Sequence, residues 1–329
     1  MYDIITFGSA TRDIFIKSKK FKIIGNKQSP TGKGFCLPLG SKIDVDDVYF
    51  FTGGGGTNTA ATFANQGFHT AFCGMVGQDS AGQEVINELE KIGIDHNFVL
   101  KNDKKLTNHS VVLSSDGKER TILVYRGASS EFTENDIPFE KLETKWIYIA
   151  PLSGEVHRLT ESLIEFALKT NTKVAMNPGN SQLSLPKGIL ERAIKKTDIL
   201  ILNQEEASLL TKIPYSKEAD IFKKIDDICP GIAIMTKGTK GVVVSDGNYL
   251  YKAKPEKSKV IDKTGAGDAF GSGFVSGVIQ SNGNIEYATQ MAMANASSCL
   301  TQWGAKNGLL KKGEMWQKVN VKKIKLTDK

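Results

Sequence analysis

Residues 260–270 read VIDKTGAGDAF, and the rest of the chain is best understood outward from this stretch. Two β-branched residues lead into a glycine-rich turn, and a helix is expected from about 265 to 280. The first N–H groups of a helix lack intrahelical partners and lie at the positive end of the helix dipole. Glycine lets an anion approach such a backbone closely. Gly265, Ala266 and Gly267 therefore form a candidate site for a phosphate or a developing negative charge.

Asp268 lies inside this candidate anion site, where its carboxylate would repel a bound phosphate. A general base directed at an acceptor hydroxyl beside the phosphate explains an acid at this position. The alternative is structural, because an acid in the first turn of a helix also interacts favourably with the helix dipole.

A second glycine-rich segment, GGGGTN at residues 53–58, precedes a helix expected from about 57 to 66. Its backbone N–H groups can meet a polar ligand, and the Asn58 amide offers both a donor and an acceptor to a sugar hydroxyl. No Lys-Ser/Thr pair follows the glycines, so the segment is not a Walker A loop, and no G-x-G-x-x-G pattern follows an expected strand. A glycine run of this kind also occurs in plain loops.

Polar residues follow two further expected strands. Asn203-Gln-Glu-Glu206 comes directly after DILIL, at the carboxyl end of a strand, where α/β proteins bind ligands. Asn203 and Glu206 can hold a hydrated Mg²⁺, or they can form a capping box at the start of the next helix. Thr236-Lys-Gly-Thr-Lys-Gly241 follows the next strand and suits nucleotide phosphates or ribose, although a β-hairpin would look the same.

Strands alternate with helices along most of the chain, which predicts an α/β fold with a doubly wound, mostly parallel sheet and helices on both faces. The β-rich segments 14–51 and 95–126, the second with an expected Asp116–Gly117 hairpin, do not fit that sheet. They predict a small β-sheet lid beside a body made of residues 1–13, 52–94 and 127–329. The expected helices cover residues 57–66, 80–92, 155–170, 186–196, 204–211, 216–228, 265–280 and 284–301.

Composition excludes several classes of protein. Hydrophobic residues make up 40% of the 329 residues and charged residues 24%, which is ordinary for a globular protein. No apolar run approaches the roughly 18 residues of a membrane span. The four cysteines form no C-x-x-C pair and no H-E-x-x-H occurs, so a zinc site is not expected. We expect a soluble, cytoplasmic protein with reduced thiols and no membrane partner.

The net charge of +7 is concentrated in two segments, 14–43 with seven lysines and no acid, and 311–329 with seven lysines and two acids. Lysine clusters can bind nucleic acid. Aromatic residues for base stacking are few in both: Phe15, Phe21 and Phe35 in the first segment and Trp316 in the second. A solvated basic surface, or one that attracts an anionic substrate, is therefore favoured over a nucleic-acid partner.

Taken together, the motifs resemble the PfkB (ribokinase-like) family of carbohydrate and nucleoside kinases over nearly the whole chain. The resemblance rests on Gly8 and Asp13 after the opening strand, the glycine loop with Asn58, Asn203-x-x-Glu206, Thr236-x-Gly238 and Asp262-x-Thr-Gly-Ala-Gly-Asp268. It implies a ribokinase-like doubly wound α/β domain with a small β-sheet lid, in agreement with the strand pattern.

The resemblance also implies a role for each matching residue. The implied roles are acceptor binding by Asp13, Gly54, Gly55 and Asn58; an anion hole at Gly265–Gly267 with Asp268 as base; ATP binding by Asn203, Thr236, Gly238, Gly241 and Lys263; Mg²⁺ at Asn203 and Glu206, partly through water; and a monovalent cation such as K⁺ at Asp262, Thr264 and Gly304.

The chain departs from the ribokinase pattern at three places. The ribokinase-type glycine loop has a lysine where this chain has Gly55, and a long basic insert separates Asp13 from that loop. The second lid segment ends in Tyr125–Arg126, which resembles the tyrosine–arginine pair that meets the carboxylate in 2-keto-3-deoxygluconate kinases. An arginine on an edge strand is the structural alternative.

The sequence thus predicts an ATP-dependent, Mg²⁺-requiring kinase that phosphorylates a hydroxymethyl group of a sugar by in-line transfer, as ribokinases and fructokinases do. The alternatives are an adenosine-type nucleoside kinase, a 2-keto-3-deoxygluconate-type sugar-acid kinase, and a ligand-binding pseudokinase on the same fold. Small sheets with exposed edges readily pair with a second copy, so a homodimer joined through the lid is expected.

Overall fold

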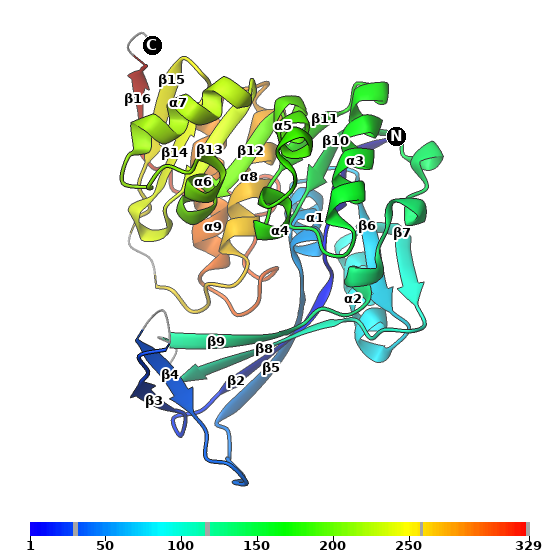
Figure 1. Ribbon diagram of the computed structural model, residues 1–329, viewed down its shortest axis with the longest axis vertical. Helices are drawn as coiled ribbons and strands as arrows, with labels where there is room; N and C mark the ends of the chain where they lie inside the picture. Colours follow the sequence, from blue (N-terminus) through cyan, green and yellow to red (C-terminus); the bar gives the residue numbers. More distant parts are fainter. Residues whose placement is uncertain (29–31, 116–118, 257–258, 327–329) are drawn as a thin grey trace.

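The computed structural model describes residues 1–28, 32–115, 119–256 and 259–326. Its largest element is a ten-stranded sheet in the order β16-β15-β14-β13-β12-β11-β10-β1-β6-β7 (Figure 1). Neighbouring strands are parallel from β13 to β7, whereas β14, β15 and β16 pair antiparallel. The strands are β1 (Tyr2–Phe7), β6 (Thr70–Gly77), β7 (Asp95–Asn102), β10 (Thr144–Ile149), β11 (Lys173–Met176), β12 (Ile199–Asn203), β13 (Ile232–Thr236), β14 (Val242–Ser245), β15 (Tyr249–Ala253) and β16 (Val321–Lys325).

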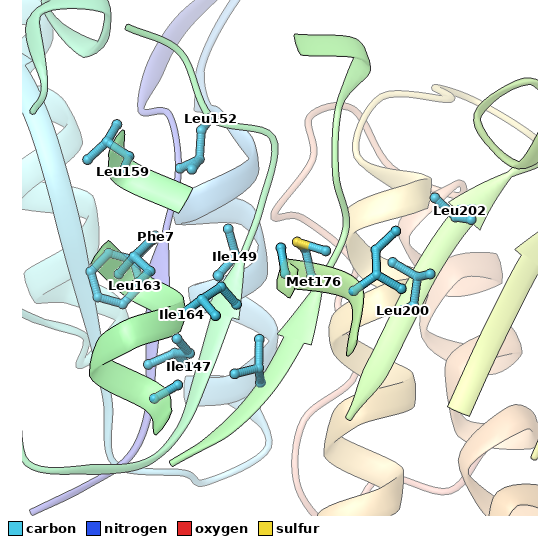
Figure 2. Packing of buried hydrophobic residues seen from close by; sticks show 14 of the residues in the cluster. Phe7, Ile147, Ile149, Leu152, Leu159, Leu163, Ile164, Met176, Leu200 and Leu202 are labelled. Atoms are coloured by element: carbon cyan, nitrogen blue, oxygen red, sulfur yellow. The ribbon is translucent and has the colours of Figure 1, made fainter. Parts of the chain in front are cut away.

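Helices cover both faces of this sheet because side chains of a strand alternate between the faces. Ile147 and Ile149 of β10 pack with α3, as Figure 2 shows, whereas Trp146 and Tyr148 pack in the cluster that includes side chains of α1, α8 and α9. One face carries α1 (Gly55–Asn65), α2 (Ser80–Ile92), α8 (Ala266–Gln280) and α9 (Ile285–Cys299). The other carries α3 (Val156–Thr170), α5 (Lys187–Lys196), α6 (Gln204–Thr211) and α7 (Glu218–Ile228), with the short α4 (Asn180–Leu183) nearby. The doubly wound fold is therefore confirmed.

A separate four-stranded sheet in the order β5-β2-β8-β9 forms the lid, which lies at the lower end of the molecule in Figure 1. β2 pairs antiparallel with β5 and parallel with β8, and β8 pairs antiparallel with β9. The expected Asp116–Gly117 turn lies outside the described residues. The lid strands are β2 (Thr11–Lys17), β5 (Asp47–Gly53), β8 (Asn108–Ser115) and β9 (Glu119–Tyr125), and a two-stranded ladder adds β3 (Lys22–Gly25) and β4 (Lys33–Cys36).

The structure corrects the predicted start of the second lid segment. Residues 95–102 form β7, which pairs parallel with β6 at the edge of the large sheet and not with the lid. The side chains of this edge strand are mostly half-buried, as they also are on the lid strand β8, so composition alone does not tell the two apart. At the other end, Asp13 lies within the lid strand β2 and not in the body.

Part of the lysine-rich carboxyl-terminal segment forms the strand β16, an element that the sequence did not predict. This strand pairs with β15 along the edge of the large sheet. Lys322 and Lys325 remain exposed, and the Lys323 ammonium lies 4.0 Å from the centre of the Tyr249 ring. Lysines on an edge strand disfavour pairing with further strands. Within the described residues, no helix has the length and apolar character needed to cross a membrane.

Candidate active site

The site is centred on the first turn of α8, where the base predicted from sequence meets the glycine-loop asparagine. Gly265 caps the helix with φ 76°, a left-handed conformation that favours glycine, and Asp268 follows in the first turn. The Asn58 Nδ2 donates a hydrogen bond to Asp268 Oδ2 over 2.8 Å. Two motifs that lie 210 residues apart in the chain are therefore joined by one direct contact.

The surroundings of Asp268 suit a proton acceptor. Burial raises the pKa of Asp268 above its ordinary value, while the hydrogen bond from Asn58 and the positive charge of Lys306 oppose that rise. A carboxylate with a raised pKa is a stronger base, yet it remains ionised at neutral pH unless the pKa approaches 7. Asp268 is thus able to take a proton from a hydroxyl held beside it.

The acceptor side of the site is built from β2 and the turn between β5 and α1. Asp13 Oδ1 accepts a hydrogen bond from Ser110 Oγ of β8 at 2.5 Å, and the Asp13 carboxylate packs so closely on Gly53 that a side chain there would collide with it. Gly54 has φ 97°. A Cβ on Gly55 would lie 3.6 Å from Asp268 Oδ1, so the glycine loop borders the base.

Asn58 keeps one polar atom available for a ligand. Its Nδ2 is used by Asp268, but its buried Oδ1 has no hydrogen-bond partner among the described residues. Buried polar atoms are rarely left unpaired, and an exception calls for a missing water or ligand. An acceptor hydroxyl that donates to Asn58 Oδ1 would satisfy it.

The structure adds Lys306, which the sequence did not single out. Its side chain is only 5% exposed, and its Nζ donates to Thr52 Oγ1 at 2.6 Å and to Glu88 Oε2 at 3.0 Å. Its positive charge also acts on Asp13 and Asp268. No motif surrounds Lys306 in the sequence. One feature of the sequence hinted at such a residue. The ribokinase-type lysine is absent at Gly55, so a cation at the predicted acceptor site has to come from another part of the chain.

The nucleotide-side residues lie at the carboxyl ends of β12 and β13, where Asn203 and Thr236 are register partners. Asn203 Oδ1 accepts from the Glu206 N–H at 2.9 Å and Glu206 Oε2 accepts from the Asn203 N–H at 2.8 Å, so the capping-box alternative is present. Beyond Thr236, Gly238 and Gly241 have φ values of 54° and 94°. Lys263 is exposed.

Glu206 is the group here that suits a hydrated cation. Burial raises the pKa of its carboxyl, and one of its oxygens already caps α6. In the described part of the chain, no three acidic, histidine or cysteine side chains cluster as a metal-binding group. Mg²⁺ commonly keeps several waters and takes only one or two carboxylates beside substrate phosphates, so Glu206 fits such an ion without a full protein ligand set.

The residues matched to a monovalent-cation site are brought together, but by hydrogen bonds within the chain. Asp262 Oδ1 accepts from the Thr264 N–H at 3.0 Å and from Thr264 Oγ1 at 2.8 Å. Asp262 Oδ2 accepts from the Gly304 N–H at 3.1 Å. Arg120 of the lid strand β9 lies 3.3 Å from Asp262 Oδ1, a contact that the sequence did not predict.

Arg126 stands apart from the acceptor residues. It is exposed at the end of β9 and lines a cavity of about 560 Å³ together with Ser130, Ser153, His157 and Arg158. No hydrogen bond within the described residues joins it to Asp13 or Asn58. Its assignment to the acceptor therefore stays a prediction.

The chain is similar to known proteins over most of its length. Residues 3–312 match the pfkB family carbohydrate kinase domain. The ribokinase of Haemophilus influenzae is 27% identical over 272 residues, 78% of this chain and 83% of that protein. The adenosine kinase of Schizosaccharomyces pombe is 26% identical over 291 residues, 80% of this chain and 84% of that protein.

The fold is also similar to that of a solved kinase. The structure of Arabidopsis thaliana ribokinase complexed with ribose and ATP superposes with a TM-score of 0.77 and 21% sequence identity, covering 94% of this chain and 96% of that one. The domain match spans most of the 329 residues. The chain therefore belongs to the pfkB family of carbohydrate kinases, ATP-dependent phosphotransferases that use an alcohol group as acceptor.

Proposed function

We propose that the protein transfers the γ-phosphoryl group of ATP to a hydroxymethyl group of a sugar, as ribokinases and fructokinases do. The observation that carries the proposal is the Asn58–Asp268 hydrogen bond. It joins the glycine-loop asparagine to a carboxylate of raised pKa in the first turn of α8. A carboxylate at that point would repel a phosphate that is only bound there, whereas phosphoryl transfer to a hydroxyl uses a carboxylate as the proton acceptor.

In the proposed reaction, Asp13 and Asn58 hold hydroxyls of the acceptor and Asp268 takes the proton from the attacking hydroxymethyl group. The backbone amides at residues 265–267 bind the negative charge that develops on the transferred phosphoryl group. When bound, Mg²⁺ neutralises charge on the ATP phosphates, and Glu206 is the residue proposed to hold it through water. The positive charge of Lys306 lowers the pKa of Asp13 and of Asp268 and so favours their ionised forms.

A sugar acid or another anionic acceptor is the second candidate, favoured by the cavity that Arg126 lines. Arg158 and His157 also face it, so positively charged and neutral donors gather there. Arginine binds carboxylate and phosphate groups through paired hydrogen bonds. Glu155 also lines the cavity and lies 3.6 Å from Arg158, which weakens its positive character. A nucleoside remains the alternative neutral acceptor.

The test is an acceptor screen with ATP and Mg²⁺ over pentoses, hexoses, sugar acids and nucleosides, with product detection by ³¹P NMR. We expect a new phosphomonoester signal for one sugar class. Gly267→Val is the matched control, because a Cβ at Gly267 points into open space outside the backbone of its own helix, on the side where a ligand would lie. ATP binding without any acceptor turnover by the wild type would instead support the pseudokinase.

We also propose that two copies associate through the lid. One face of the lid exposes apolar side chains of its two edge strands, Val48 and Phe50 of β5 and Leu123 and Tyr125 of β9. Exposed apolar strands at sheet edges are typical of pairing surfaces. Sedimentation of Leu123→Glu should show a monomer, while Leu209→Glu, an equally exposed leucine on α6, should leave the dimer intact. A monomeric wild type would contradict this proposal.

We also propose that the protein is located in the cytoplasm. All four cysteines are free, and three of them, Cys73, Cys229 and Cys299, are buried in the body. Free thiols are typical of reducing compartments. Fractionation of the native cells, with the protein detected by antibody, tests this placement.

A further inference from the structure

Asp262 is a buried carboxylate that needs a positive partner. Its side chain is 3% exposed. The hydrogen bonds from Thr264 and Gly304 satisfy its oxygens but carry no charge. A buried carboxylate without a counter-charge is strongly destabilised, and a neighbouring cation removes much of that cost.

Arg120 supplies that charge from the lid. Its NH1 lies 3.3 Å from Asp262 Oδ1 and donates to Thr264 Oγ1 at 2.8 Å, and Thr264 Oγ1 in turn donates to Asp262 Oδ1. The three groups form a closed hydrogen-bonded triangle. Thr264 directly precedes Gly265, so the triangle holds the backbone that leads into the anion site at the start of α8.

The lid makes a second contact at the same place. The Trp303 ring stacks on Tyr49 of β5 at 5.1 Å and meets Phe15 of β2 edge-on at 5.8 Å. The next residue, Gly304, donates its N–H to Asp262 and leaves no room for a side chain beside Phe51. The lid, the loop 303–304 and the loop 262–264 therefore converge on Asp262.

We propose that Arg120 is a positioning residue that latches the lid to the anion-site loop and takes the place of the monovalent cation. A guanidinium at this distance from Asp262 repels a second cation, so the two cannot share the carboxylate. The enzyme then needs no added K⁺, and closure of the lid directly orders the backbone amides at residues 265–267. The catalytic part of this inference rests on the proposed kinase function, whereas the latch itself does not.

The experiment compares wild type, Arg120→Ala, Arg120→Lys and the control Lys20→Ala. Lys20 is another lid cation, but its ion pair is with the exposed Asp44, away from this loop. Hydrogen–deuterium exchange of peptides covering 119–125 and 259–265 reports the latch. Thallium-205 NMR, with Tl⁺ as a K⁺ mimic, reports cation binding without any substrate. Turnover of the best acceptor is measured in KCl and in tetramethylammonium chloride.

For the wild type we expect no bound Tl⁺ and equal turnover in the two salts. Arg120→Ala should exchange faster in both peptides and lose roughly 10- to 100-fold in turnover, as expected for the loss of charge-assisted hydrogen bonds. Arg120→Lys should recover part of the protection, and Lys20→Ala should behave as wild type. Tl⁺ binding displaced by K⁺ in the wild type, or unchanged exchange in Arg120→Ala, would overturn the proposal. Tl⁺ binding and hydrogen–deuterium exchange need no substrate, so both can be measured even if no acceptor is found.

Discussion

Replacing Asp268 by asparagine separates proton transfer from every other property of the site. Asparagine has nearly the same shape, and its amide oxygen can still accept the hydrogen bond that Asn58 Nδ2 donates over 2.8 Å. It cannot accept the proton of the attacking hydroxyl. General-base catalysis is worth about 10²–10⁴-fold in rate, or about 2.7–5.4 kcal/mol of activation free energy. Asp268→Asn should therefore lose at least about 10²-fold in kcat.

The same substitution should not weaken the fold. Burial raises the pKa of Asp268, so its carboxyl binds a proton more readily in the folded than in the unfolded chain. The folded state is then favoured by this group at low pH, and that contribution is lost as the pH rises through the folded-state pKa. Above the folded-state pKa, the ionised group opposes folding. Asp268→Asn should thus have an equal or higher free energy of unfolding at pH 7.

The assay couples ADP release to NADH oxidation, and titration calorimetry measures ATP affinity. Removing a negative charge near the phosphates should leave ATP affinity equal or improved. Asp103→Asn, on an exposed turn, is the matched control and should behave as wild type. Turnover of Asp268→Asn within tenfold of the wild type, with the best acceptor, would show that the first turn of α8 is only a phosphate cradle.

Three further substitutions test other parts of the site. Lys306→Met should move the acid limb of the pH–kcat profile to higher pH, because the Lys306 charge holds down the pKa of both Asp13 and Asp268; an unmoved limb would contradict this electrostatic role. Gly267→Val should keep the melting temperature, since a Cβ there contacts nothing beyond its own stretch of α8, but lose most of its ATP turnover; normal activity would exclude anion binding there. Arg126→Ala should raise KM roughly 10-fold or more for a carboxylate-bearing acceptor and leave neutral sugars unchanged, as competition kinetics would reveal. Activity confined to neutral sugars rejects the sugar-acid candidate.

Local sequence determined most of the elements and was enough to single out Asp268 as the candidate base. Alternation of apolar strands and helices predicts the doubly wound body because burial on both faces of a parallel sheet demands it. Short-range chemistry also sets the ends of α2: Asp79 caps it by accepting from the Gly82 N–H at 2.7 Å, and Gly93 follows it in the left-handed conformation. Asp268, Asn58 and the glycine turns were recognisable for the same reason, since their roles depend on backbone geometry within a few residues.

Only the tertiary structure decided which charged residues from distant segments lie next to one another. The sequence could not show that Lys306 would be buried beside Asp13 and Asp268, because it reaches the site from a loop some 250 positions from Thr52, the residue that binds it. Arg120 and Asp262 are similarly remote, 142 positions apart, and only the docked lid brings them within 3.3 Å. The assignment of β7 to the large sheet likewise depends on its partner strand β6. Pairing between segments has no local signature, whereas periodicity, capping and turn chemistry are properties of neighbouring residues.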